Sequence, residues 1–276
     1  MIKIEEDIRG KVVIITGGSQ GIGKGCAEVF CAYGANVVIC ARGEELGRRV
    51  AGELTEKGPG KCLFFRCDVS DAEQVRELVE FTVKQFGKLD CLINNAAQCP
   101  AQRPIDEIPI EETRHLFQTN FIGLFAGCKY ALPYLRSSKG SIINIGSILG
   151  AVGQEGSTIY SATKGAISTF TKSLAMDEAR NGVRVNNVKP GHIVTEIYER
   201  NKERSGDPEA FEKWSNEVQW LGRGGEPEEI GYTCLFLASR WAGFTTGTDV
   251  YATGGYELGE GHKVTLFDWD AKMKKA

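Results

Sequence analysis

Short apolar runs rich in β-branched residues alternate with helix-length amphipathic stretches along most of this 276-residue chain. Two parallel strands need a long connection, usually a helix, which returns the chain to the same edge of the sheet. The alternation therefore predicts an α/β fold with one doubly wound parallel sheet of about seven strands, flanked by helices on both faces. The predicted strands, each mostly apolar as strands covered on both faces should be, are Val12–Thr16, Asn36–Ala41, Cys62–Cys67, Cys91–Asn94, Ser141–Ser147, Arg184–Lys189 and Asp249–Thr253.

The segments between these strands have the pattern of helices. Several of them are followed by Gly or Asn, which are common just past the end of a helix. The predicted helices are Gly21–Tyr33, Glu44–Lys57, Asp71–Phe86, Glu111–Leu135, Thr158–Asn181 and Glu226–Ser239. No linker or internal repeat interrupts the pattern, so we expect a single domain over residues 1–276.

The segment Thr195–Gly225 breaks the alternation, because it is long, charged and carries Trp214 and Trp220. It follows the strand whose carboxyl end should face the ligand crevice of a doubly wound sheet. We interpret it as a substrate lid, with an ordinary surface helical hairpin as the alternative. We expect the C-terminal tail, residues 256–276, to pack on a neighbouring subunit, to close a pocket, or to fray.

The formal net charge of -3 and the isoelectric point near 5.8 provide no long-range attraction for nucleic-acid phosphates or anionic lipids. No Lys/Arg-rich run compensates, so we expect a small-molecule substrate and neither nucleic acid nor membrane as a partner. The first residues are acidic, and the apolar run after them is too short to cross a bilayer. We therefore predict neither a signal peptide nor an anchor and expect a cytoplasmic protein.

The nine cysteines are scattered singly, with no Cys-x-x-Cys pair and an odd total. This spacing argues against a disulfide framework and against a zinc site, so we predict no bound metal. Most of the cysteines are expected to be small buried apolar residues.

A glycine-rich stretch, Thr16–Gly23, follows the first strand and opens the first helix. At such a turn glycines allow a tight bend and a close approach of backbone N–H groups to a pyrophosphate, which predicts a dinucleotide site. The Gly-x3-Gly-x-Gly spacing resembles that of the short-chain dehydrogenase/reductase family, and the resemblance covers nearly the whole chain. It implies a Rossmann-type fold and a nicotinamide dinucleotide, held here by Gly17, Ser19, Gln20, Gly21, Ile22 and Gly23.

The end of the second strand bears on the choice between NAD(H) and NADP(H). An Asp or Glu there would bind the ribose hydroxyls and repel a 2′-phosphate, but Ala41 occupies that position and Arg42 follows it. An arginine can bind a phosphate through two N–H groups, so Arg42 favours NADP(H), which carries a 2′-phosphate. NAD(H) stays the alternative, because Gln20 is neutral where NADP-dependent relatives often carry a basic residue.

Three further strand ends resemble cofactor-binding elements of the family. The third strand ends in Asp-Val, and the fourth in Asn-Asn-Ala-Ala, where the family has Asn-Asn-Ala-Gly. The sixth ends in Pro-Gly-His-Ile-Val-Thr, which resembles a Pro-Gly-x3-Thr element. The contacts implied are Asp68 and Val69 at the adenine, Asn95 beside its ribose, and Ile193 and Thr195 at the nicotinamide carboxamide.

Tyr160 and Lys164 are four residues apart in a predicted helix, which places both on one face, and Ser147 ends a predicted strand upstream. A phenol with a pKa near 10 is a poor base at neutral pH, so proton abstraction needs a nearby cation, which Lys164 supplies. These residues resemble the Ser, Tyr-x3-Lys arrangement of the family, in which the serine holds the substrate oxygen and the other two also contact the cofactor. Asn120 matches a fourth member, which is implied to hold a water for proton relay.

Several stretches outside these motifs resemble one branch of the family, the type 14 17β-hydroxysteroid (retinal short-chain) dehydrogenases, which are cytosolic, tetrameric and NAD-dependent. The stretches are Cys91–Ala96, Ala131–Arg136, Gly150–Gln154 and Gly254–Gly259. The substrate pocket that this resemblance implies comprises Cys99, Gln154, His192 and Glu260. Two of these residues, His192 and Glu260, make the pocket polar, and an unpaired polar group buried against steroid rings costs about 1–3 kcal/mol. The resemblance implies a 17β-hydroxysteroid as the substrate. Because the pocket is polar, we hypothesise a smaller polyol or sugar as its rival.

The sequence thus predicts an oxidoreductase that transfers a hydride between a nicotinamide dinucleotide and a secondary alcohol or ketone. Two alternatives stay open: an NADPH-dependent carbonyl reductase of a different substrate, and a non-catalytic dinucleotide-binding sensor that kept the fold. The resemblance also implies a homotetramer, in which the predicted helices Glu111–Leu135 and Thr158–Asn181 pair between subunits. The side chains of Phe117, Phe121, Phe125 and Phe170 fit such an interface and fit a core face equally.

Overall fold

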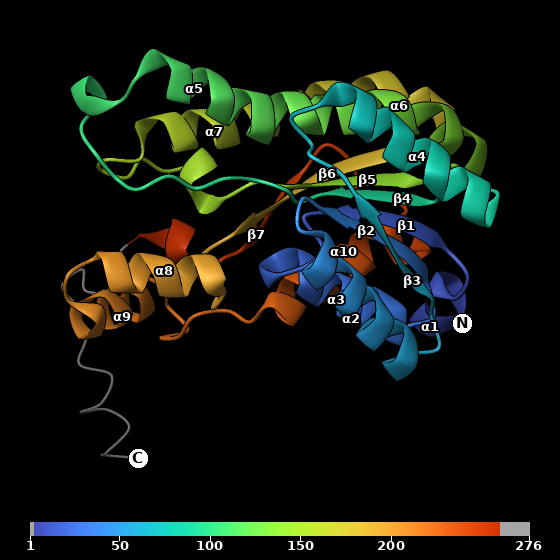
Figure 1. Ribbon diagram of the computed structural model, residues 1–276, viewed down its shortest axis with the longest axis horizontal. Coiled ribbons are helices and arrows are strands. Elements are labelled where there is room, and N and C mark those ends of the chain that lie inside the picture. Colours follow the sequence, from blue (N-terminus) through green and yellow to red (C-terminus); the bar gives the residue numbers. More distant parts are fainter. Residues whose placement is uncertain (1–2, 260–276) are drawn as a thin grey trace.

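A parallel sheet of seven strands forms the centre of the computed structural model, which describes residues 3–259 (Figure 1). Its strand order is β3-β2-β1-β4-β5-β6-β7, and every neighbouring pair runs parallel. The order reverses between β1 and β4, which is where a doubly wound sheet opens a crevice at its carboxyl edge. The strands are β1 Val12–Thr16, β2 Asn36–Ala41, β3 Cys62–Arg66, β4 Cys91–Asn94, β5 Ser141–Ile145, β6 Arg184–Pro190 and β7 Asp249–Ala252.

Helices cover both faces of this sheet. The helices are α1 Ile4–Ile8, α2 Gly21–Ala32, α3 Glu44–Lys57, α4 Ala72–Phe86, α5 Ile110–Phe117, α6 Gly123–Ser138, α7 Thr158–Glu178, α8 Glu196–Arg204, α9 Pro208–Glu217 and α10 Pro227–Ala238. Helices α2, α3 and α10 pack on one face, and α4, α6 and α7 pack on the other (Figure 1). The fold therefore has three layers with a hydrophobic core on each side of the sheet.

Side chains of the central strand β1 alternate between these two cores. Val13 and Ile15 belong to the core that α2, α3 and α10 cover, whereas Val12 and Ile14 belong to the core on the opposite face. All four are buried, and each such aliphatic side chain contributes roughly 1.5–3 kcal/mol when it leaves water. Burial on both faces explains the continuous apolar runs of the sequence and confirms the predicted α/β class.

The predicted helix Glu111–Leu135 is helical throughout but is not one regular α-helix, because the structure divides this stretch into three parts. Helix α5 ends at Phe117, a π-helical turn covers Gln118–Ile122, and α6 then continues to Ser138. The π turn contains Asn120, whose buried side chain bonds the backbone of the loop after β4. A π turn inserts one extra residue into a helix. Apolar periodicity cannot show such an insertion, since the turns on either side keep their helical pattern.

The other predicted elements differ from the observed ones only near their ends. Strand β3 ends at Arg66 and β7 at Ala252, each one residue early, while β5 stops two residues early at Ile145 and β6 gains Pro190. Helix α1 has no counterpart among the predicted elements. It has five residues, of which Ile8 alone is buried, so it is too short to produce a periodic pattern.

The segment Thr195–Gly225 folds into the two short helices α8 and α9, which lie beyond the carboxyl end of β6 (Figure 1). This is the helical hairpin that was the alternative to a lid. Because residues of both helices line the cavity described below, the hairpin also occupies the place expected of a lid.

The prediction that most of the cysteines are buried is confirmed. All nine are free, and eight of them are buried. The sulfur atoms of Cys26 and Cys234 lie 3.9 Å apart as neighbouring thiols in the core. Cys99 is half-buried and lines the cavity at the carboxyl edge of the sheet.

Within residues 3–259, none of the helices combines the length and the apolar character that a membrane crossing requires. The same part of the chain contains no group of three or more His, Cys, Asp or Glu side chains arranged to hold a metal ion.

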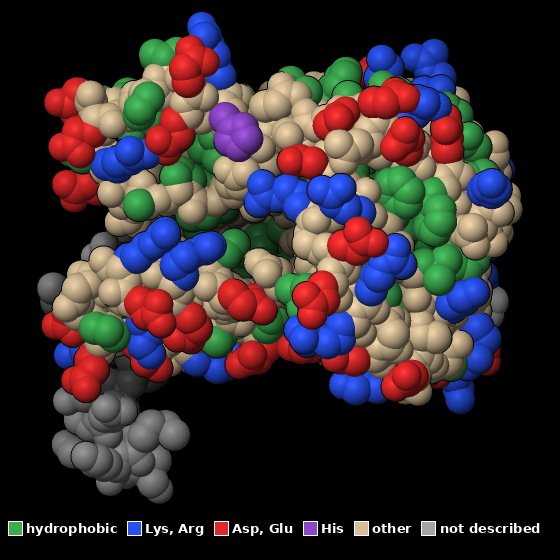
Figure 2. Space-filling model, in the orientation of Figure 1, with side chains coloured by type: hydrophobic (Ala, Val, Ile, Leu, Met, Phe, Trp, Pro, Cys, Tyr) green, Lys and Arg blue, Asp and Glu red, His purple; other side chains and the backbone are tan. Residues whose placement is uncertain are grey.

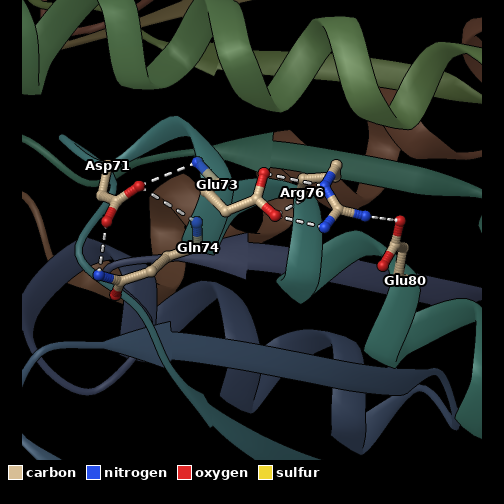
Figure 3. Close-up of polar contacts among 5 residues, drawn as sticks. All are labelled: Asp71, Glu73, Gln74, Arg76 and Glu80. Carbon is tan, nitrogen blue, oxygen red and sulfur yellow. Dashed lines mark hydrogen bonds and ion pairs between the residues drawn. The ribbon is translucent and has the colours of Figure 1, made fainter.

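The first turn of α4 fixes the loop that follows β3 (Figure 3). Asp71 caps the helix, since its carboxylate accepts hydrogen bonds from the N–H groups of Glu73 at 2.9 Å and Gln74 at 3.4 Å. The Gln74 side chain donates to Asp71 at 2.9 Å and accepts from the N–H of Asp68 at 2.9 Å. These bonds hold Asp68 at the carboxyl edge of the sheet. The ion pairs farther along α4 in Figure 3 are exposed and contribute little.

A line of buried polar side chains connects the sheet to α7. Nδ2 of Asn94 on β4 donates to Oδ1 of Asn144 on β5 at 2.9 Å, and Nδ2 of Asn144 donates to Oγ1 of Thr171 on α7 at 2.9 Å. All three side chains are buried. Because buried polar groups are stable only when they are paired, this network fixes the position of α7 against the centre of the sheet.

We expect Asn144→Leu to lower the free energy of unfolding by about 1–3 kcal/mol, because the new side chain has a similar size but leaves buried polar partners unpaired. The measurement is urea unfolding followed by circular dichroism. Asn36→Leu makes the same change at the half-buried first position of β2 and should have a much smaller effect. Equal losses in the two variants would contradict the proposed importance of the network.

Candidate active site

A cavity of about 670 Å³ opens at the carboxyl edge of the sheet, where the strand order reverses. Its walls come from the glycine-rich turn after β1, from the ends of the following strands, and from α8 and α9. Figure 2 shows the molecule hollowed between α8 and the elements opposite it, with Lys and Arg side chains on both sides of the hollow. The cavity is lined by every described residue that the sequence assigned to a site except Gly23 and Asn120. Glu260 lies outside the described residues.

The glycine-rich turn is built for the close approach of a ligand. Gly17 and Gly21 have positive φ angles of 66° and 52°, which glycine adopts without strain. A Cβ atom at Gly23 would lie 2.3 Å from the carbonyl oxygen of Gly17, so no larger residue fits there. Gln20 occupies the N-cap of α2 without capping it by its side chain. The first N–H groups of α2 can therefore bind an anion such as a pyrophosphate.

Asn95 holds this turn against the end of β4. Its Nδ2 donates to the carbonyl oxygens of Thr16 at 2.9 Å and Gly17 at 3.2 Å. In return, Oγ1 of Thr16 accepts from the N–H groups of Asn95 at 2.9 Å and Ala96 at 3.0 Å. Asn95 also lines the cavity, so it is positioned to act on a ligand while its amide orders the turn. The sequence reasoning did not single out Thr16.

The far end of the cavity, beside the ends of β2 and β3, is positively charged. Ala41 and Arg42 line it, and Arg42 is exposed. Nε of Arg66, the last residue of β3, donates to the carbonyl oxygen of Arg42 at 3.4 Å, so Arg66 supports the backbone of Arg42 without lining the cavity itself. Arg66 has no counterpart in the sequence prediction, because the pairing of β2 with β3 brings it beside Arg42.

Asp68 and Val69 line the cavity next to these arginines. Burial raises the pKa of Asp68, but hydrogen bonds from the N–H and the hydroxyl of Ser70, with the charges of Arg42 and His115, hold it below its ordinary value. Both bonds from Ser70 reach Oδ1, at 3.0 and 2.7 Å, so Ser70 leaves Oδ2 unused. The carboxylate is therefore ionised at neutral pH and able to accept a hydrogen bond from a ligand.

Ser147, Tyr160 and Lys164 come together on the opposite wall. Ser147 follows β5, and its Oγ accepts from the N–H of Leu149 at 3.1 Å. Tyr160 and Lys164 lie in the first two turns of α7, with Nζ of the lysine 5.7 Å from the centre of the phenol ring. Nζ also donates to the carbonyl oxygen of Ile145 at 2.8 Å. Strand β5 thus supplies both the serine and the anchor of the lysine.

Burial changes the acidity of this pair of groups. It raises the pKa of Tyr160 above its ordinary value, the neighbouring Cys99 adds to the rise, and a hydrogen bond with Ser147 opposes it. Burial also lowers the pKa of Lys164 to about 8, because the ammonium loses most of its hydration. A phenol that releases a proton here therefore needs added positive charge, and Lys164 is the cation beside it.

Asn120 lies behind these residues. Its Oδ1 accepts from the N–H of Gln98 at 2.8 Å, and its Nδ2 donates to the carbonyl oxygen of Gln98 at 2.9 Å and lies 3.3 Å from Oγ1 of Thr163. The π turn of α5–α6 presents the side chain to Gln98, whose loop lines the cavity. Asn120 thereby joins this loop to α7. The proton-relay role implied by the family resemblance stays a prediction.

Ile193 and Thr195 continue the wall after β6. Ile193 is buried and forms an isolated β-bridge with Gly225. Oγ1 of Thr195 accepts from the N–H of Tyr198 at 3.3 Å and so caps α8. A Cβ atom added at Gly21 would lie 3.3 Å from Cγ2 of Thr195. The start of α8 is therefore packed against the glycine-rich turn.

His192 lies in an aromatic environment at the wall of the cavity. Its Nδ1 lies 2.6 Å from Oγ of Ser215, and its backbone N–H donates to Oε1 of Gln219 at 2.9 Å. Burial lowers the pKa of His192 to about 4, so the imidazole is neutral at physiological pH. The rings of Phe211 and Trp214 approach it. The sequence pattern marks Trp214 only as part of the segment Thr195–Gly225 and carries no signal for Phe211.

The other predicted pocket residues, Cys99 and Gln154, also line the cavity. Burial raises the pKa of the Cys99 thiol, with a smaller opposing effect of Lys164, so the thiol is protonated at neutral pH. The sulfur lies 3.9 Å from the carbonyl oxygen of Pro100. Cys99 therefore presents a neutral, weakly polar surface beside Tyr160.

Comparison with known proteins gives similarities over nearly the whole chain. A family model described as Enoyl-(Acyl carrier protein) reductase matches residues 17–257. The chain is 45% identical over 252 residues to an L-fucose dehydrogenase of Oryctolagus cuniculus, covering 91% of this chain and 87% of the relative. It is 46% identical over 254 residues to an L-fucose dehydrogenase of Bos taurus, covering 92% of each chain. The ligand-free structure of Thermoplasma acidophilum aldohexose dehydrogenase matches with a TM-score of 0.84 at 30% identity, covering 94% of this chain and 98% of that one.

The buried lysine predicts an unusual dependence of stability on pH. The pKa of Lys164 is about 8 in the folded chain and 10.5 in the unfolded chain, so between these values the unfolded chain binds more protons. The contribution of this one group to the free energy of unfolding should therefore rise with pH across this interval, by at most about 3 kcal/mol. In Lys164→Met this contribution is absent, so the wild type should gain stability relative to the variant from about pH 8 to 10.5.

The measurement is urea unfolding of both proteins, without added dinucleotide, at several pH values. Lys84→Met, which changes an exposed lysine of α4, is the control and should follow the wild type. A difference between wild type and Lys164→Met that stays constant with pH would show that Lys164 does not carry the expected burial cost.

Proposed function

The chain belongs to the short-chain dehydrogenase/reductase family and is an NAD(P)-dependent oxidoreductase, and we propose that its substrate is a small sugar or polyol. Two of the relatives are named as L-fucose dehydrogenases and the structural neighbour as an aldohexose dehydrogenase. The resemblance to 17β-hydroxysteroid dehydrogenases predicted a steroid substrate. We propose the sugar or polyol in preference to it.

The size of the cavity is the observation that carries this proposal. Cavities of roughly 300–1,000 Å³ bind one drug-sized ligand, and this one has about 670 Å³ for both the dinucleotide and the substrate. A dinucleotide takes up most of such a volume. The remaining space suits a ring of the size of a monosaccharide better than the four fused rings of a steroid.

The polar character of the substrate side supports the same choice. Gln154, His192, Asn201 and Arg204 line it together with aromatic rings. A steroid would leave most of these polar groups without partners, at about 1–3 kcal/mol for each one that is buried. The hydroxyl groups of a sugar can pair with them.

In the proposed reaction Tyr160 is the acid/base. Its phenolate accepts the proton of the substrate hydroxyl during oxidation, and the hydroxyl of Ser147 donates a hydrogen bond to the substrate oxygen. Lys164, which Ile145 holds in place, stabilises the phenolate by its charge. A bound nicotinamide dinucleotide supplies the hydride acceptor for oxidation and the hydride donor for the reverse reaction.

The described residues fit a nicotinamide dinucleotide. The glycine-rich turn leaves no room for a Cβ atom at Gly23, and the N-terminus of α2 has no side-chain cap, so backbone N–H groups can hold the pyrophosphate. We propose that Ala41 and the guanidinium group of Arg42 favour NADP(H), because a 2′-phosphate there meets positive charge. NAD(H) is the alternative.

A preference for NADP(H) would also favour the second candidate function, a carbonyl reductase, since cells use NADPH mainly as a reductant. The same residues catalyse both directions, so the choice affects the physiological direction and leaves the roles of Ser147, Tyr160 and Lys164 unchanged.

We also propose that the chain forms a homo-oligomer through the outer surfaces of α6 and α7. Phe121 and Phe125 pack against Phe170 across these helices, with ring centres 5.6 and 6.1 Å apart. Phe125 and Met176 nevertheless stay exposed. Large exposed apolar side chains on adjacent helices are typical of a surface that another subunit covers.

We expect Tyr160→Phe to reduce kcat for L-fucose and related sugars by a factor of about 10²–10⁴, because the general acid/base is lost. Binding of the dinucleotide, followed by nicotinamide fluorescence, should persist. The control is Tyr33→Phe, on the face of the sheet that α2 covers. Full turnover in Tyr160→Phe would exclude the mechanism, and the absence of any turnover in the wild type would favour the dinucleotide sensor.

Titration of NADPH and NADH with the purified protein tests the cofactor proposal. We expect NADPH to bind at least tenfold more tightly, a difference of about 1.4 kcal/mol, and Arg42→Ala to remove most of this margin. The control is Arg48→Ala, because Arg48 lies nearby on α3 and pairs with Glu44. Tighter binding of NADH by the wild type would instead assign the chain to the NAD-dependent enzymes.

A further inference from the structure

We propose that α9 carries a stacking platform for the sugar ring, formed by Phe211 and Trp214 beside His192. The inference rests on the proposed function and extends it, because it assigns the binding of a pyranose face to particular side chains of the hairpin. The reacting hydroxyl would lie toward Tyr160, on the other side of the same cavity.

The three rings form one group at the cavity wall. The ring centre of His192 lies 4.9 Å from that of Trp214, at an interplanar angle of 52°, and 6.5 Å from that of Phe211, at 5°. The centres of Phe211 and Trp214 are 5.8 Å apart. Phe211 and Trp214 are three residues apart on α9, so they share a helix face. All three residues line the cavity.

The exposure of these rings distinguishes a platform from a small hydrophobic core inside the hairpin. Trp214 is 37% exposed and Phe211 is half-buried, whereas the buried residue of α9 is the polar Ser215. Tyr198 of α8 is buried and packs against Phe211 with ring centres 5.5 Å apart. Tyr198 therefore supports the platform from within the hairpin, while Phe211 and Trp214 keep exposed ring surface.

Hydrogen bonds fix the platform relative to the sheet. The buried Ser215 contacts Nδ1 of His192 at 2.6 Å. His192 lies two residues after the end of β6. Gln219 accepts from the N–H of His192 at 2.9 Å and donates to the carbonyl oxygen of Arg223 at 2.8 Å. The two contacts of His192, with Ser215 and with Gln219, connect α9 and the residues just after it to the segment that follows β6 at the cavity wall. A platform held in this way does not need to be ordered when the ligand binds, which favours affinity.

The chemistry of the platform suits a neutral sugar. A pyranose ring has a face of C–H groups, which packs on an aromatic ring, and a rim of hydroxyls, which needs polar partners. With Nδ1 engaged by Ser215, Nε2 is the ring nitrogen of the neutral His192 that would pair with such a hydroxyl. A hydroxyl can both donate and accept, so it pairs with either tautomer of the imidazole. Gln154 and Asn201 line the same cavity and offer further amide groups.

The experiment compares three variants in steady-state oxidation of L-fucose and of 2-butanol, a secondary alcohol without a ring. Trp214→Leu keeps an apolar side chain but removes the aromatic face, and Trp214→Phe keeps an aromatic face. Trp220→Leu is the matched control, because Trp220 is an exposed tryptophan just after α9 that does not line the cavity. Circular dichroism and the KM for the dinucleotide report whether each variant keeps its fold and its cofactor site.

We expect Trp214→Leu to raise KM for L-fucose at least tenfold with kcat within about threefold of the wild type, and to leave KM for 2-butanol unchanged. Trp214→Phe should restore most of the affinity, and Trp220→Leu should match the wild type. If the wild type oxidises L-fucose and Trp214→Leu keeps the wild-type KM, or raises KM for both alcohols equally, the platform is refuted while the proposed function stands. If the wild type oxidises no monosaccharide at all, the sugar assignment falls and the platform falls with it.

Discussion

The ammonium group of Lys164 lies almost completely buried at the carboxyl edge of the sheet, and the rest of the site depends on keeping it there. A buried charge is costly, and the lowered pKa of about 8 expresses that cost. The carbonyl oxygen of Ile145, where β5 ends, accepts one N–H of the ammonium. The end of β5 therefore fixes both the cation and, two residues later, Ser147. Helix α7 has to sit against this strand in one position, which the amide network through Asn144 provides.

The cavity is assembled from both halves of the doubly wound sheet. The half before the reversal supplies the glycine-rich turn and Arg42, which follows β2. The half after it supplies Ser147, Tyr160, Lys164 and the helical hairpin. Asn95 joins the two halves, because it follows β4 and bonds the carbonyl oxygens of Thr16 and Gly17 after β1. A dinucleotide that spans the reversal would therefore lie along one edge of the sheet, with its adenosine end beside β2 and β3 and its nicotinamide end beside Tyr160.

The hairpin of α8 and α9 gives this common arrangement its own character. In the proposed function, the glycine-rich turn and the Ser147, Tyr160 and Lys164 group serve the exchange of hydride and proton, and they place little restriction on the rest of the substrate. Side chains of the hairpin form a further part of the cavity wall. Under this proposal, substrate selectivity and catalysis rest largely on different elements, which allows one to change without the other.

The sequence by itself determined the architecture, because the alternation of apolar strands with amphipathic helices leaves few ways to bury both faces of a sheet. It also located the glycine-rich turn and the Ser, Tyr and Lys positions, since local spacing fixes where a tight turn and one helix face must lie. Local patterns could not reveal the π turn around Asn120, which arises when a buried side chain bonds a loop from another strand. Nor could they bring Arg66 beside Arg42, or Phe211 and Trp214 beside His192. Those proximities join residues from separate elements, so only the register of the sheet and the packing of the hairpin decided them.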